Sequence, residues 1–225
     1  MTTITPPLVV DLDGTLLNSD LLFETGMTFL RNQPLSLFKP FIWLTRGKAA
    51  LKEGLALANN IDVSVLPYDP QVIELIKTER SLGRRIVLAT ASHYSLAKQI
   101  AEHLNLFDQV LATTSSQNLS GKQKRDLLIQ HYGDQGFDYA GNSHDDIPVW
   151  EAARYAYVVN PDKGVEHRAA AHGNVQQVIR SKSSSLKDWA KALRLHQWMK
   201  NALIFAPLLA AHQLTNLTLL WQGVL

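Results

Sequence analysis

Short apolar runs alternate with longer stretches of helical periodicity along the first 180 residues. The strand-like runs lie near residues 7–11, 85–90, 108–113, 137–141 and 155–159. Most of the stretches that separate them have the mixed polarity typical of amphipathic helices. This order favours an α/β fold, a doubly wound parallel sheet with helices on both faces. In such sheets the carboxyl ends of the strands form the usual ligand crevice.

The segment from about 17 to 67 interrupts this alternation directly after the first strand. It is rich in Leu, Phe and Ala, which predicts a small helical cap. The aromatic side chains of Phe38, Phe41 and Trp43, together with Ile42, are expected in the core of that cap. Arg46 is a candidate substrate contact, because residues 45–48 present two cations beside a glycine. Solvated charge at a helix end explains the same residues equally well.

The last 46 residues differ in charge from the rest of the chain. The net charge is +2 overall, yet from Arg180 onward six basic residues accompany one acidic residue. Residues 181–185 are expected to form a flexible linker. Residues 186–225 then predict a basic amphipathic and apolar tail, suited to the surface of an anionic membrane. An ordinary helix packed on the globular domain is the alternative, and no nucleic-acid motif accompanies the charge.

Composition excludes some classes of protein. With 225 residues and 46% hydrophobic content, the chain can bury one sizeable core plus an appendage. It has no cysteine, so a disulfide framework and a thiolate metal site are both excluded. The first residues lack the basic and long apolar parts of a secretory signal. We therefore expect a cytoplasmic protein, with its tail on the cytoplasmic face of the membrane.

Two carboxylates stand where the first apolar strand meets a glycine. Asp11 and Asp13 follow the run Leu-Val-Val and precede Gly14. Residues i and i+2 of an extended segment face the same side, so both carboxylates can address one bound group. Gly14 lets the backbone turn sharply away from the strand end. The pattern indicates a site at the carboxyl end of this strand.

The run Asp-Leu-Asp-Gly-Thr resembles motif I of the haloacid dehalogenase (HAD) superfamily of phosphotransfer enzymes, and later segments resemble further motifs in the same order. Residues 85–92 match motif II with Thr90 as the hydroxyl, while Ser92 is expected to cap the helix around 94–104. Residues 121–128 match motif III, where the spacing Gly-x-x-Lys favours Lys124 and leaves Lys122 as a rival. A solvated basic turn is the other interpretation of that segment.

Residues 137–148 resemble motif IV, with one departure. Asn142 stands where the family has its first aspartate, and Asp146 falls on the second acidic position. An amide oxygen can coordinate a hard cation but adds no negative charge, which puts metal affinity and hydrolytic rate in doubt. Asp145 is either a neighbouring ligand or a helix cap. His144 is expected to be a bystander, since magnesium prefers oxygen ligands.

The resemblance implies a HAD-like Rossmannoid domain over residues 1–180, phosphoserine-phosphatase-like, that hydrolyses a small phosphorylated substrate with Mg²⁺. Asp11 would be the nucleophile and Asp13 the general acid and base. Thr90 and Lys124 would hold phosphoryl oxygens. The implied magnesium ligands are Asp11, the Asp13 carbonyl, Asn142 and Asp146, the last directly or through water.

A second resemblance concerns the tail. Residues 192–201 are similar to the beginning of UbiA-type membrane prenyltransferases, and the chain stops about where their first membrane span would begin. It lacks their Asp-rich loops, so prenyl transfer is not expected from this polypeptide itself. Three hypotheses follow: a phosphohydrolase tethered to the membrane, a catalytically weak domain that regulates or scaffolds a prenyltransferase, and a soluble phosphatase with a packed C-terminal helix.

Overall fold

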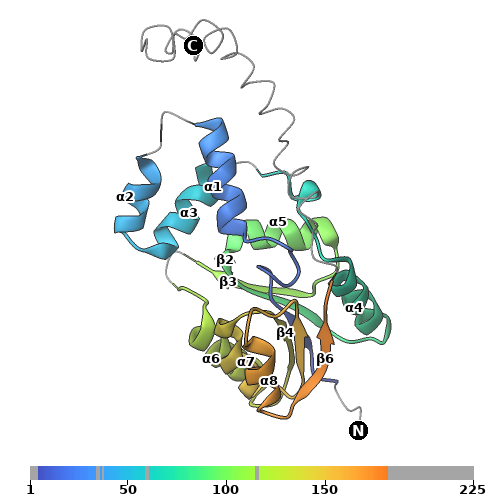
Figure 1. Ribbon diagram of the computed structural model, residues 1–225. Helices are drawn as coiled ribbons and strands as arrows, with labels where there is room; N and C mark the ends of the chain where they lie inside the picture. Colours follow the sequence, from blue (N-terminus) through green and yellow to red (C-terminus); the bar gives the residue numbers. More distant parts are fainter. Residues whose placement is uncertain (1–4, 34–35, 37, 59–60, 115–116, 182–225) are drawn as a thin grey trace, which may run out of the picture. The chain divides into compact units, whose positions relative to one another are not determined.

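The computed structural model describes residues 5–33, 36, 38–58, 61–114 and 117–181, which contain a parallel six-stranded sheet (Figure 1). The strand order is β3-β2-β1-β4-β5-β6. The strands are β1 (Leu8–Val10), β2 (Ile86–His93), β3 (Gln109–Thr113), β4 (Asp138–Gly141), β5 (Ala156–Val159) and β6 (Val175–Ile179). The predicted parallel α/β sheet is confirmed. The sequence pattern missed β6, an edge strand whose centre exposes two glutamines.

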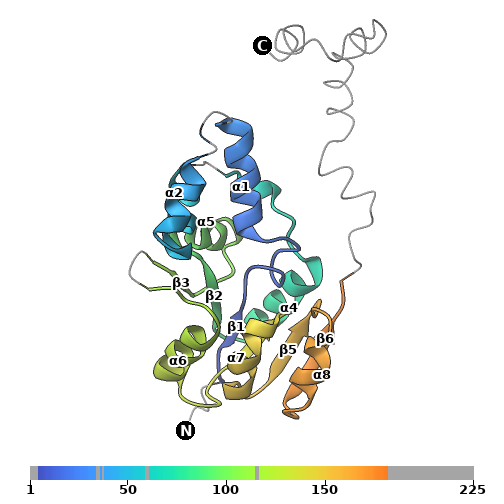
Figure 2. The ribbon, with the colours of Figure 1, turned by 60° about the vertical axis from the view of Figure 1, so that its left-hand side comes forward.

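Helices cover both faces of the sheet (Figure 2). On one face, α4 (Pro70–Ser81) and α5 (Tyr94–Leu104) pack against Leu8 and Val10 of β1. On the other, α6 (Gly121–Tyr132), α7 (Ile147–Ala152) and α8 (Val165–Ala170) pack in the cluster that contains Val9. Successive strand side chains point to opposite faces, so one three-residue strand supplies both cores. Each fully buried Leu or Val contributes on the order of 2 kcal/mol.

Local signals set the ends of the helices. Asp69 caps α4, accepting the backbone N–H of Gln71 at 2.9 Å, and Pro70 occupies the first helical position. Helix α5 begins at the predicted residue, but its cap is His93, whose Nδ1 accepts the N–H of Ser95 at 3.3 Å. The prediction that Ser92 caps this helix is therefore wrong. The Ser92 hydroxyl donates to Asp13 instead.

The segment between β1 and α4 is helical. It contains α1 (Leu21–Asn32), α2 (Lys39–Thr45), α3 (Lys48–Ala58) and a short 3₁₀ turn, η2 (Val63–Val65). In both views α1, α2 and α3 gather beyond one edge of the sheet (Figures 1 and 2). Trp43 holds them together: its ring meets that of Phe29 edge-on at 5.6 Å, and a Cβ on Gly54 would lie 2.4 Å from it.

The expectation that the other large apolar residues of α2 form the core of the cap is wrong. Phe38 and Phe41 are 59% and 71% exposed, and Ile42 is 47% exposed. Helix α2 has about two turns, and Trp43 takes the inward position, so the adjacent positions face outward.

The chain divides into two units, Met1–Ser181 and Lys182–Leu225. Apart from Ser181, the predicted linker at 181–185 and tail at 186–225 lie outside the described residues. None of the helices within the described ranges combines the length and apolar character needed to cross a membrane.

A buried charge cluster anchors the start of β4. Asp138 is fully buried and pairs with Arg84, with Arg154 at 2.8 Å and with the backbone N–H of Tyr155 at 3.2 Å. Asp138→Asn is expected to lower the free energy of unfolding by about 3 kcal/mol, because it removes the fully buried counter-charge of the Arg84 guanidinium and leaves it only Glu79, at 3.0 Å. Urea denaturation measures this. Asp126→Asn, at an exposed pair, should change stability little, and equal stability of both variants would contradict the assignment.

Candidate active site

The loop after β1 carries the two motif I carboxylates. The N–H of Asp11 donates to the carbonyl of Ala140 at 2.9 Å, which continues the β1–β4 ladder past the end of the strand. Gly14 has φ +72°, and a Cβ on it would lie 2.2 Å from Nδ2 of Asn142. Gly14 is therefore required both for the turn and for the close approach of the loop after β4.

A buried lysine connects this loop to two other elements. Lys124, in the first turn of α6, is 4% exposed, and its Nζ donates to Asp11 Oδ1 at 2.7 Å and to Tyr139 Oη at 2.8 Å. The same Nζ lies 3.5 Å from Asp146 Oδ1. Lys122 is exposed. Of the two rival lysines, the structure brings Lys124 to the carboxylates.

Asp13 is held by a different set of donors. Its Oδ1 accepts the backbone N–H of Leu21 at 2.7 Å, at the start of α1. Its Oδ2 accepts Ser92 Oγ at 2.7 Å and Thr90 Oγ1 at 3.4 Å. Thr90 Oγ1 in turn accepts the N–H of Ser92 at 2.9 Å. The end of β2 thus places two hydroxyls on Asp13, and Ser92 makes the shorter contact.

The loop after β4 is organised by Asp146. Its Oδ2 accepts the N–H of Asn142, the N–H of Ser143 and Ser143 Oγ, each at 3.0 Å, while Oδ1 accepts Tyr139 Oη at 2.7 Å. The Asn142 side chain accepts Thr15 Oγ1 at 3.3 Å. A direct bond from Asp146 to a cation would replace one of these contacts. His144 and Asp145 are exposed.

The environments of these carboxyl groups shift their pKa values in different directions. Burial raises the pKa of Asp11 to about 7, although Lys124 opposes the shift. Burial also raises the pKa of Asp13. Asp146 is buried as well, yet Lys124 and its hydrogen bonds lower its pKa. The result is a charged Lys124–Asp146 pair beside two carboxyls that hold a proton more readily than usual.

Arg46 is the one predicted site residue that stands apart. It is exposed at the end of α2, and within the described ranges its side chain makes no hydrogen bond or ion pair. The structure brings the other six together: Asp11, Asp13, Thr90, Lys124, Asn142 and Asp146.

Besides Ser92, sequence reasoning missed two contributors. Lys52 of α3 extends its Nζ to the carbonyl of Ala91, at 2.7 Å, and so ties the helical segment to the end of β2. Burial lowers its pKa, while Asp13 and Asp20 oppose the shift. Tyr139 bridges Lys124 and Asp146. Two signals in the sequence could have pointed to them: Lys52 stands in a largely apolar helical run, and Tyr139 stands in a short, fully buried strand.

Comparison with known proteins now decides the family. Residues 8–151 match the family of haloacid dehalogenase-like hydrolases, and this stretch contains every residue of the carboxylate cluster described above. The chain belongs to the haloacid dehalogenase-like hydrolase family.

A curated relative of this HAD-like hydrolase is the uncharacterized protein y4nM of Sinorhizobium fredii (strain NBRC 101917 / NGR234). It is 39% identical over 203 residues, which are 90% of this chain and 39% of that protein. The chain therefore spans well under half the length of this relative.

Solved structures share the fold. A protein of unknown function from Bordetella pertussis Tohama I superposes with a TM-score of 0.61 at 19% identity, over 79% of this chain and 99% of the other. A phosphoserine phosphatase in its apo form gives a TM-score of 0.55 at 14% identity, over 84% and 98%. At such low identity these likenesses establish the HAD-like architecture alone.

The donor set of this HAD-like site fits a hard cation. No group of three His, Cys, Asp or Glu side chains within the described ranges is arranged to hold a metal. The available donors are instead the Asp11 carboxylate, the Asn142 amide oxygen and backbone carbonyls, and Mg²⁺ prefers few carboxylates with several waters. Lys124 is shared between Asp11 and Asp146, so a single ammonium faces two carboxyl groups. A divalent cation would supply the further positive charge.

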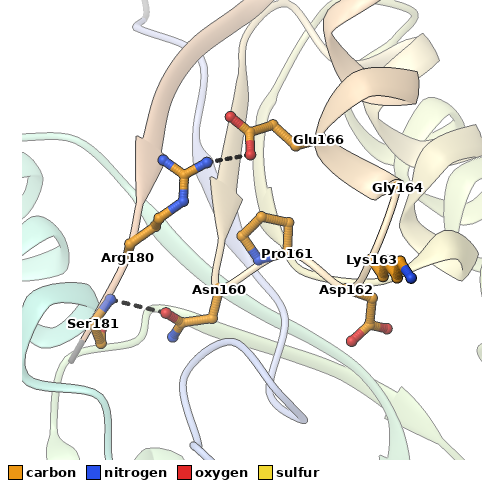
Figure 3. A pocket seen from close by; sticks show the side chains of 8 residues that line it. All are labelled: Asn160, Pro161, Asp162, Lys163, Gly164, Glu166, Arg180 and Ser181. Atoms are coloured by element: carbon orange, nitrogen blue, oxygen red, sulfur yellow. Dashed lines mark hydrogen bonds and ion pairs between the residues drawn. The ribbon is translucent and has the colours of Figure 1, made fainter. Parts of the chain in front are cut away.

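A separate pocket of about 330 Å³ lies at the carboxyl ends of β5 and β6 (Figure 3). Arg180 in its wall is paired with Glu166, and Asn160 accepts the N–H of Ser181 at 2.8 Å. This pocket contains none of the six residues of the Asp11 cluster, so it is separate from the candidate active site.

Proposed function

We propose that this HAD-like hydrolase is a magnesium-dependent phosphomonoesterase that acts on a small phosphorylated substrate through an aspartyl phosphate on Asp11. One observation carries the proposal: two carboxyls two residues apart have different fixed partners. Asp11 is bound by the Lys124 ammonium, whereas Asp13 is bound by a hydroxyl and a backbone N–H. Different environments for paired carboxyls suit different roles in catalysis.

In the first step a carboxylate oxygen of Asp11 attacks phosphorus, and the bond from phosphorus to the ester oxygen breaks. Asp13 donates its proton to that leaving oxygen, so the product departs as an alcohol. Burial raises the pKa of Asp13, which favours the protonated form that this step needs. Lys124 is placed to neutralise the charge shared between Asp11 and the phosphoryl oxygens.

In the second step water attacks the phosphorus of the aspartyl phosphate. Asp13, now ionised, takes a proton from the water, and the bond from phosphorus to the Asp11 oxygen breaks. Inorganic phosphate leaves, Asp11 is a carboxylate again and Asp13 is protonated. The Ser92 and Leu21 contacts fix the position of Asp13 through both steps.

The magnesium ion, when bound, would draw charge from the phosphoryl oxygens. We propose that Asp11, the Asp13 carbonyl and Asn142 hold it, with Asp146 acting through water. Asp146 also positions Asn142, because it binds the N–H of that residue. Thr90 would donate its hydroxyl to a phosphoryl oxygen. Ser92 could do the same, because its hydroxyl also lies beside Asp13.

The magnesium dependence tests both the reaction and the unusual ligand. The full chain is expected to hydrolyse p-nitrophenyl phosphate with Mg²⁺ and to lose that activity in EDTA. Asn142→Asp should lower the Mg²⁺ concentration for half-maximal rate by about tenfold, since it adds a negative charge to the ligand set. His144→Ala, an exposed position in the same loop, is the matched control. An unchanged magnesium titration in Asn142→Asp would remove Asn142 from the ligands.

A second candidate function is a catalytically weak domain that regulates or scaffolds a UbiA-type membrane prenyltransferase. Asn142 favours it, because a neutral ligand weakens the metal site. The chain also spans 39% of the length of its Sinorhizobium relative. In this proposal, as in the first, residues 186–225 tether the domain to the cytoplasmic face of the membrane. Weaker co-sedimentation with anionic vesicles is expected after Lys187→Gln and Lys191→Gln, and unchanged binding would contradict that tether.

A further inference from the structure

An exposed apolar face lies on the helical segment between β1 and α4. Phe38, Phe41, Ile42 and Leu44 are between 47% and 71% exposed, and α2 contributes no buried residue. We call these four residues the α2 face. Large apolar side chains that gather on a solvent-exposed surface indicate an interaction site.

The exposure of the α2 face follows from how the helix packs. Trp43 is the side chain of α2 that contacts both neighbouring helices, through Phe29 of α1 and Gly54 of α3. Phe38, Phe41 and Ile42 stand at i, i+3 and i+4, so they lie together on a different side of the helix from Trp43. The core of this segment is thus filled without them.

The charge around the α2 face is mainly positive. Residues 21–58, which contain α1, α2 and α3, have five cations and two carboxylates, Glu24 and Glu53. Three of those cations, Arg31, Arg46 and Lys48, are exposed, and within the described part of the chain none forms an ion pair. The apolar residues therefore lie in a positively charged surrounding.

We propose that the α2 face docks on an anionic lipid bilayer, with Phe38, Phe41 and Ile42 entering the interface. Charge complementarity selects this occupant. A second copy that met it with the same face would bring the same cations, and the segment from Arg180 onward has six basic residues against one acidic residue, so both would be repelled. An anionic lipid surface attracts the cations and accepts the apolar side chains. This contact is independent of the tail and adds a second attachment.

The absence of cysteine from the chain allows a local test in the full-length protein. A nitroxide spin label on Phe41→Cys reports the α2 face, and a label on Leu82→Cys, 76% exposed after α4, is the matched control. With vesicles of phosphatidylglycerol and phosphatidylcholine, the label at 41 is expected to become accessible to oxygen and protected from a water-soluble nickel chelate. The label at 82 should stay in water.

The same labels distinguish other occupants. Vesicles of phosphatidylcholine alone, or added salt, should weaken the change at position 41. A label at 41 that stays in water while the protein sediments with vesicles would overturn the proposal, since the tail alone then binds. Dipolar broadening without vesicles would reveal a second copy on the α2 face. Immobilisation of the label without broadening would reveal the chain's own tail there. Either result would overturn the lipid proposal. Phe41→Ser with Ile42→Ser should weaken binding about tenfold, and Leu82→Ser should not.

Discussion

Asp11→Asn is expected to lower the rate of phosphomonoester hydrolysis by about four orders of magnitude. The variant keeps the shape of the side chain and its place beside Lys124, but an amide oxygen is a far poorer nucleophile toward phosphorus than a carboxylate. Initial rates with p-nitrophenyl phosphate and saturating Mg²⁺ measure the effect, which should appear in kcat.

Asp145→Asn is the matched control, because Asp145 is an exposed carboxylate in the neighbouring loop. It should retain the wild-type rate. Thermal unfolding of both variants checks that the fold is kept. Asp11→Asn with the activity of the control would exclude Asp11 as the nucleophile.

Lys124→Met is expected to lower the rate by about 10²- to 10³-fold. Lys124 neutralises Asp11 and Asp146 together, and its removal takes away a preorganised positive charge where the phosphoryl group would lie. Methionine preserves much of the buried volume. Lys122→Met, two residues earlier in the same helix, should have no effect because that side chain is exposed.

Lys124 is buried, so the activity of Lys124→Met is informative only if the variant folds. Thermal unfolding of the variant is therefore measured together with its kinetics. Lys124→Arg keeps the charge and should retain more activity than Lys124→Met. If the two lysine-to-methionine variants had equal rates in folded protein, Lys124 would have no part in the chemistry.

The sheet could be predicted because its strands are short apolar runs between helices of mixed polarity. The edge strand β6 escaped, since Gln176 and Gln177 break the apolar run and only one of its faces needs to be buried. Sequence periodicity also placed Phe41 in a core. A helical pattern shows that apolar residues share a face, but it does not show that another element covers that face.

The carboxylates could be predicted because residues i and i+2 at a strand end share a side. The choice between Lys122 and Lys124 needed the structure: they point about 160° apart around α6, and packing decides which of them turns inward. Ser92 was assigned to a cap because serine suits both roles. Lys52 was missed since its contact with Ala91 joins segments 39 residues apart.

The aspartyl phosphate proposed on Asp11 can be trapped during turnover. The full chain would be mixed with p-nitrophenyl phosphate and Mg²⁺, quenched during steady turnover and reduced with borohydride, which converts an aspartyl phosphate to homoserine. Peptide mass spectrometry then locates the modified residue. Homoserine is expected at position 11, with Asp13 unmodified; sustained turnover with Asp11 unmodified, or modification at another carboxylate, would exclude an aspartyl phosphate on Asp11.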